Sequence, residues 1–77
     1  MKVRVECSRG QKADERPVRF KLNDRDYIVE EIQDHWKALD GEFFKVLADD
    51  GNLYILRRRV VGGGDDWSLQ SIGPREH

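Results

Sequence analysis

Nucleophilic and metal-binding side chains are scarce in this chain of 77 residues. It contains one cysteine, Cys7, and two histidines, His35 and His77. No two of these residues have the spacing of metal ligands, so the sequence predicts no metal site. Cys7 alternates with Val3 and Val5, which is typical of a small core residue on a strand. The sequence nominates no base that would activate its thiol, so a nucleophilic role is not expected.

Paired acid–base chemistry is also poorly supported. Asp34 and His35 are adjacent, and neighbouring side chains on a strand point to opposite faces, so they do not form a ready dyad. Most other aspartates lie in turns, where carboxylates usually accept hydrogen bonds from backbone amides. The run Gly62–Gly64 lacks the following Lys-Ser/Thr and the helix that a phosphate-binding loop needs. We therefore expect no enzymatic activity and no cofactor.

Basic residues provide the clearest hint of a binding surface. Arg57–Arg59 is the densest basic run, and on a strand Arg57 and Arg59 share the outward face. Arg58 then points inward, and we expect its stem to pack near a barrel mouth with its guanidinium in water. Arg19 and Lys21 form a second outward basic pair.

These two pairs predict a nucleic-acid-binding face if their strands are neighbours. They would then form a basic stripe beside Phe43 or Trp36, the combination of charge and aromatic side chains found in single-strand binders. The candidate site residues are Arg19, Lys21, Arg57 and Arg59. The competing interpretation is a solvated strand face whose charges discourage edge-to-edge aggregation.

The overall charge limits this hypothesis. Fourteen basic and fifteen acidic residues leave a net charge of −1, whereas a dedicated polyanion binder would be strongly basic. A local basic patch remains compatible with that balance. The alternative function is a protein–protein interaction module that adds a partner strand to an exposed sheet edge or pairs with itself.

The central element is a β-hairpin over residues 42–57, with a turn at Asp49–Asn52. A two-residue turn would place Val46 opposite Ile55. A three-residue loop with Gly51 left-handed instead pairs Phe44 with Leu56, Val46 with Tyr54 and Ala48 with Asn52. The second register gathers the large apolar side chains on one face, so we predict it.

Further strands are predicted on both sides of this hairpin. Alternation indicates strands at Lys2–Cys7 and Pro17–Leu22, the latter with Val18, Phe20 and Leu22 inward. A polar connection covers Ser8–Glu15, and Asn23–Asp26 has the composition of a turn. Tyr27–Ile32 fits a strand with a bulge near Glu30 and Glu31. The alternative is a helix over Ile28–Leu39, whose apolar residues are spaced four, four and three apart.

The last part of the chain completes the predicted sheet. The strand continues through Val61 to a mobile glycine-rich loop at Gly62–Asp66, and Trp67–Ile72 returns with Trp67 and Leu69 inward. Six short strands predict an all-β antiparallel meander curled into a small barrel or roll, similar to a Src-homology-3 domain. Residues 1–74 form one domain, and 75–77 are expected to be a disordered tail or tag remnant. We find no signal-peptide or membrane-spanning run and expect a cytoplasmic protein.

Several of these segments also occur together in known proteins. They are Arg16–Leu22, Tyr27–Ile32, Trp36, Phe43–Val46, Asp49–Leu56 and Trp67–Leu69. This layout resembles a family of short, uncharacterised bacterial cytoplasmic proteins over roughly residues 1–72. The stretch from Phe43 to Leu69 is also similar to the small C-terminal segment of polymerase-like DNA-damage mutagenesis proteins. The resemblances bring no catalytic residues and imply a stand-alone module with a slight tilt towards DNA-related work. The expected partner of the basic residues is nucleic acid or a nucleic-acid enzyme.

Overall fold

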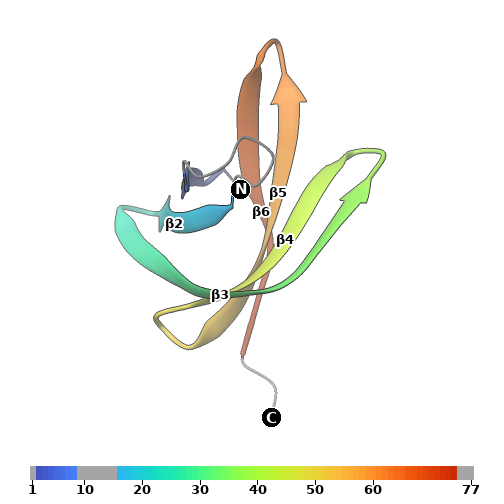
Figure 1. The fold of residues 1–77 in the computed structure, drawn as a ribbon. Helices are drawn as coiled ribbons and strands as arrows, with labels where there is room; N and C mark the ends of the chain where they lie inside the picture. The colour runs from blue at the N-terminus through green and yellow to red at the C-terminus, as the bar shows by residue number, and fades with distance from the viewer. Residues whose placement is uncertain (1, 9–15, 75–77) are drawn as a thin grey trace.

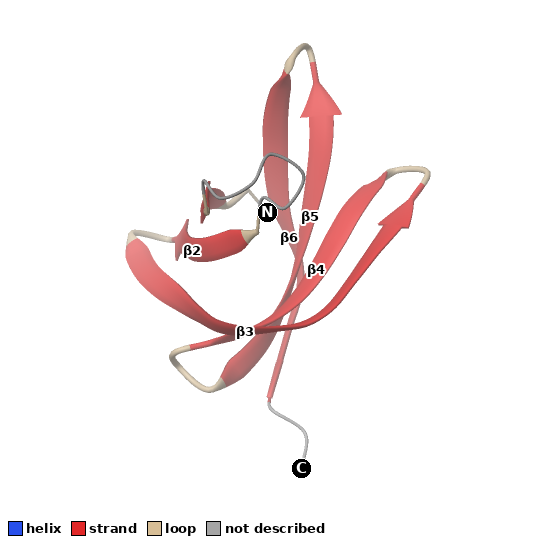
Figure 2. Cartoon of the chain, in the orientation of Figure 1, coloured by secondary structure: helices blue, strands red, loops and turns tan. Residues whose placement is uncertain are grey.

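The computed structural model describes residues 2–8 and 16–74, and within these ranges the regular structure is entirely strand (Figures 1 and 2). The strands are β1 (Arg4–Cys7), β2 (Pro17–Leu22), β3 (Arg25–Ala38), β4 (Gly41–Ala48), β5 (Asn52–Val61) and β6 (Gly64–Pro74). The predicted all-β class is confirmed, and the alternative helix over Ile28–Leu39 is wrong. Most of the predicted connection at Ser8–Glu15 and the predicted tail at 75–77 lie outside the described residues.

The six strands form an antiparallel meander in sequence order. The long strand β3 bends the sheet, because its first residues pair with β2 and the remainder pairs with β4. Figure 1 shows the resulting curl into a half-barrel. The segment before β1 meets β6 at an isolated bridge between Lys2 and Ser68, and the Val3 amide donates to the Trp67 carbonyl at 3.4 Å. The predicted barrel or roll is therefore present in a partly open form.

The concave face carries the core. Its buried side chains come from four strands and the segment before β1, and include Val3, Phe20, Leu22, Phe44, Val46, Ala48, Tyr54, Leu56 and Trp67. The ring of Phe20 stacks on Tyr27 and meets Tyr54 edge-on, each at a centroid distance of 5.0 Å. Burying these rings is the dominant stabilising contribution, because each ring removes a large apolar area from water. A chain with one cysteine can form no internal disulfide that would add to it.

The central hairpin has the predicted three-residue loop. Phe44 pairs with Leu56 and Val46 with Tyr54, and all four side chains are buried. Gly51 has a φ of 85°, and its amide donates to the Ala48 carbonyl at 3.0 Å. The register follows from the need to bury four large side chains on one face.

Two bulges in β3 change which of its side chains point to the concave face. The register shifts between Val29 and Glu31, which confirms the predicted bulge, and shifts again between Ile32 and Asp34. Each extra residue reverses the alternation, so Val29, Ile32 and His35 are opposite Ala48, Val46 and Phe44 on the concave side. The second bulge, at Gln33, was not predicted.

One inward assignment on β2 is wrong. Val18 is exposed to 42% of its maximum, while Pro17 is buried. The cause is a register irregularity, because Glu6 pairs with Arg19 but Cys7 pairs with Pro17. Val18 is therefore the extra residue of a bulge and turns away from the core.

The glycine-rich segment forms a tighter turn than expected. Val61 pairs with Gly64, so only Gly62 and Gly63 form the turn, with φ values of 58° and 84°. Both values fit the mirror-image turn that joins twisted strands in a two-residue hairpin. Gly64, Asp65 and Asp66 belong to β6 and not to the predicted loop. Of the predicted turn at Asn23–Asp26, only Asn23 and Asp24 form the turn, also with positive φ at both residues. Arg25 and Asp26 belong to β3, where they pair with Leu22 and Lys21.

Candidate functional site

The four candidate basic residues lie on two strands that are not neighbours. Arg19 and Lys21 are on β2, Arg57 and Arg59 are on β5, and β3 and β4 separate these strands in the sheet. All four side chains are on the convex face, as alternation predicts, but they do not form the single stripe that adjacent strands would have produced.

The β2 pair lies in a mixed-charge neighbourhood. Arg19 is opposite Glu6 on β1, with 3.9 Å between its Nε and Glu6 Oε2. Lys21 pairs across the strands with Arg4 on one side and Asp26 on the other. Because carboxylates neighbour both cations, this part of the surface has little net positive charge.

The β5 pair gathers around Gly41. A Cβ atom at Gly41 would lie 3.1 Å from Cγ of Arg57 and 3.3 Å from Cγ of Arg59. The missing side chain therefore lets both arginine stems lie over the β4 backbone. Asp66 on β6 pairs across the strands with Arg59, and Asp40 is a second nearby carboxylate, with 3.6 Å between its Oδ2 and Arg57 Nη1. The Asp40 side chain is 66% exposed, so water screens its ion pair with Arg57 and the pair contributes little stability.

Two aromatic rings lie next to Arg57 across neighbouring strands of the sheet. Trp36 pairs with Phe43, and Phe43 pairs with Arg57. The rings of Trp36 and Phe43 stack with 5.4 Å between centroids and 4° between planes. Trp36 remains 38% exposed. We call Trp36, Phe43, Arg57 and Arg59 the outer patch.

The concave mouth of the half-barrel carries a separate polar cluster. His35 stacks on Phe44 at a centroid distance of 4.4 Å, and its Nε2 lies 2.5 Å from Glu42 Oε2. Arg58 reaches Glu42 at 3.5 Å and Asp65 at 3.3 Å and lies over the Trp67 ring. Its inward direction agrees with the prediction, but carboxylates rather than water alone surround its guanidinium.

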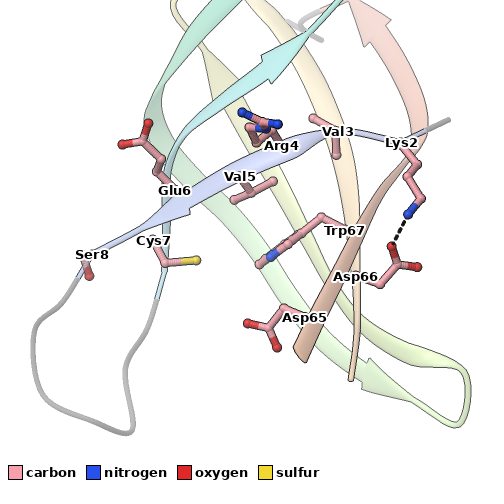
Figure 3. A pocket seen from close by; sticks show the side chains of 10 residues that line it. All are labelled: Lys2, Val3, Arg4, Val5, Glu6, Cys7, Ser8, Asp65, Asp66 and Trp67. Atoms are coloured by element: carbon pink, nitrogen blue, oxygen red, sulfur yellow. Dashed lines mark ion pairs between the residues drawn. The ribbon is translucent and has the colours of Figure 1, made fainter. Parts of the chain in front are cut away.

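A groove separates β1 from the beginning of β6. Its volume is about 710 Å³, and Trp67 lies in it. Figure 3 shows Val5 and Cys7 pointing into this groove, and Lys2 Nζ lies 3.2 Å from Asp66 Oδ1 at its rim. Among residues 2–8 and 16–74, no three histidine, cysteine or acidic side chains cluster as metal ligands would. The described residues also include no helix long and apolar enough to cross a membrane.

The hairpin turn contains the titratable groups with perturbed pKa values. Partial burial raises the pKa of Asp50, but hydrogen bonds from the Tyr54 hydroxyl and from Asn52 outweigh this, so the pKa is lowered. Burial, together with the bond to Asp50, raises the pKa of the Tyr54 hydroxyl well above its usual value. This pair ties the loop to the core.

Comparisons with known proteins give no family assignment. No family model matches the chain, and neither the curated proteins nor the solved structures contain a match. The case for the outer patch as a binding site therefore rests on its geometry. Sequence reasoning named both aromatic residues, but it missed their pairing because the bulge at Gln33 decides which face Trp36 occupies.

Proposed function

We propose that this protein is a non-catalytic module that binds single-stranded nucleic acid at the outer patch. The observation that carries the proposal is a stack of the exposed Trp36 on the half-buried Phe43 beside two arginines, on a face that the main core does not use. The parallel rings present a flat apolar surface on which a base can stack. Arg57 and Arg59 would contact the adjoining phosphates.

The chemistry of the patch predicts weak, sequence-tolerant binding. Every base has a π-face, and stacking one base on an aromatic side chain contributes roughly 1–3 kcal/mol. Each phosphate contact should steepen the salt dependence, with a slope of about −0.7 in the logarithm of affinity per contact for single strands. The net charge of −1 and the Asp40 carboxylate both oppose binding, so we expect affinity only at low salt.

Fluorescence anisotropy of a labelled oligothymidylate, measured at about 20 mM and about 150 mM salt, tests the proposal. The variant R57Q/R59Q should reduce both the affinity and the salt slope. The matched control is R19Q/K21Q, which removes the same charge from β2 and should retain most of the affinity. Loss of binding only in the first variant would support the outer patch.

Two single substitutions separate stacking from charge. Trp36→Ala should weaken binding by roughly 5-fold to 150-fold, because one base loses its platform. Asp40→Asn should strengthen binding, since it removes the carboxylate nearest Arg57. The proposal is wrong if the wild-type protein fails to bind at low salt, or if R19Q/K21Q weakens binding as much as R57Q/R59Q.

A further inference from the structure

β6 is the terminal strand of the sheet, and among residues 2–8 and 16–74 no strand lies beside much of its outer edge. β5 pairs with it along one side, from Asn52 opposite Pro74 to Val61 opposite Gly64. On the other side, within the described part of the chain, backbone pairing is limited to the bridge between Lys2 and Ser68 and the bond from the Val3 amide to the Trp67 carbonyl. The backbone of Leu69–Pro74 therefore presents hydrogen-bonding groups on a sheet edge.

This edge lacks the charges that usually protect edge strands. Charged residues make up 38% of the chain, yet the eight residues from Trp67 to Pro74 include none. Lysines, other charges and bulges normally prevent a second chain from pairing with an edge. The other edges carry such charges, since β1 has Arg4 and Glu6, and the part of β3 beyond β2 has four charged residues together with two bulges. In residues 67–74 of β6 the only such devices are a bulge at Gln70 and the terminal Pro74.

A bulge in β6 places two apolar side chains on one face. Leu56 pairs with Leu69 and Ile55 with Ser71, so Gln70 is the extra residue. Leu69 and Ile72, three positions apart, thus share the concave face, and Ile72 is 52% exposed. The bulge also shortens the regular ladder, so any partner would form a small interface.

We propose that β6 pairs antiparallel with β6 of a second copy of this chain. A strand without charges meets its own copy without the like-charge repulsion that a charged edge would suffer. The net charge of −1 adds little long-range repulsion between copies. About a two-fold axis, Leu69 of one copy can lie opposite Ile72 of the other, so the same apolar contact forms twice.

This proposal concerns a different surface from the nucleic-acid proposal. The outer patch reaches β6 only through the pairing of Arg57 with Ser68 and of Arg59 with Asp66, which precede the free edge. Pairing through Leu69–Pro74 would leave one outer patch on each copy. Because such an interface is small, we expect a weak, concentration-dependent dimer.

Analytical ultracentrifugation from about 5 µM to about 1 mM tests the pairing, since weak interfaces associate in this range. The wild-type protein should shift from monomer to dimer. Ile72→Lys should weaken association by about tenfold or more, because two apolar contacts are lost together. The matched control Ile28→Lys changes another exposed isoleucine, 55% exposed and on the opposite face of the sheet, and should dimerise normally.

A second measurement identifies the contact itself. In a mixture of isotope-labelled and unlabelled protein, a filtered nuclear Overhauser experiment should connect the methyl groups of Leu69 and Ile72 on different copies. The proposal is overturned if the wild-type protein stays monomeric throughout, if Ile28→Lys weakens association equally, or if that intermolecular signal is missing from the dimer. Oligonucleotide binding by Ile72→Lys, measured separately, reports on the outer patch alone.

Discussion

Removing the Tyr54 hydroxyl should reveal how strongly the hairpin loop is tied to the core. The ring is 2% exposed and packs edge-on against Phe20 with 5.0 Å between centroids. Its hydroxyl donates to Asp50 Oδ2 at 2.5 Å. Tyr54→Phe preserves the ring and its packing, so the change in stability measures this hydrogen bond rather than a cavity.

The expected loss is about 1.5 kcal/mol at pH 7. A hydrogen bond to a charged group contributes roughly 1.5–3 kcal/mol, and the lower end applies because the exposed Asp50 can regain water. Asp50 also keeps its bonds from the Asn52 amide at 3.1 Å and the Asn52 side chain at 3.2 Å. For a domain of this size, the loss corresponds to a fall of about 6–12 °C in Tm.

The pH dependence gives this prediction a definite sign. The pKa of Asp50 is lowered in the folded protein, so the ionised carboxylate contributes stability at pH values above its unfolded pKa. That contribution is lost as pH falls through the folded pKa. The difference between wild type and Tyr54→Phe should therefore be largest near neutral pH and shrink below about pH 4.

Urea unfolding at pH 7 and pH 2.5, followed by tryptophan fluorescence, to which the buried Trp67 and the more exposed Trp36 both contribute, provides the assay. A double-mutant cycle with Asp50→Asn isolates the pair from changes elsewhere in the turn. The reasoning would be refuted by a destabilisation under about 0.5 kcal/mol at pH 7, or by an equal destabilisation at both pH values.

The remaining predictions concern the backbone conformation of two glycines and the burial of two side chains on β2. Gly41→Ala should cost about 2 kcal/mol or more in urea unfolding, because its φ is 147° and the new Cβ would lie 2.9 Å from the Arg58 carbonyl oxygen. Gly51→Ala should cost about 1 kcal/mol, since it has a φ of 85° but no atom within 4 Å of the added Cβ. Val18→Thr should change stability by less than about 0.5 kcal/mol, whereas Phe20→Ala should cost about 3–5 kcal/mol, since Val18 is 42% exposed and Phe20 is 1% exposed.

Much of the strand pattern could be predicted because large apolar residues mark the buried face. At the central hairpin, only one of the two registers places Phe44, Val46, Tyr54 and Leu56 together, and the structure has that register. The bulge near Glu30 could be predicted for the same reason, because Ile32 would otherwise point outward. A large apolar residue that departs from the regular alternation can be seen directly in the sequence.

Other features leave no such signal. Alternation with Phe20 and Leu22 favours Val18 as the buried residue, and nothing in the sequence indicates the bulge because Pro17 is also apolar. Which of the two is buried depends on how β1 aligns, where Cys7 pairs with Pro17 after Glu6 has paired with Arg19. The unpaired edge of β6 could likewise be described only when the strand order and the limited contact with β1 were known.

Prediction of the candidate site from the sequence was limited in the same way, because the sequence does not give the strand order. Outward basic residues could be identified on each strand, but their neighbours across the sheet could not. Two intervening strands separate Arg19 and Lys21 from Arg57 and Arg59. The aromatic partners of the β5 pair follow from the register of β3 against β4, which places Trp36 beside Phe43.

The bulge at Gln33 determines whether the outer patch exists. Ile32 and Trp36 are four positions apart, so an unbroken strand would place both on the concave face. The extra residue reverses the alternation, so that His35 stacks on Phe44 inside and Trp36 stacks on Phe43 outside. A regular strand would bury the tryptophan and direct the histidine outward, beside the two arginines. The same bulge thus produces both the exposed aromatic platform and the His35–Glu42 pair at the concave mouth.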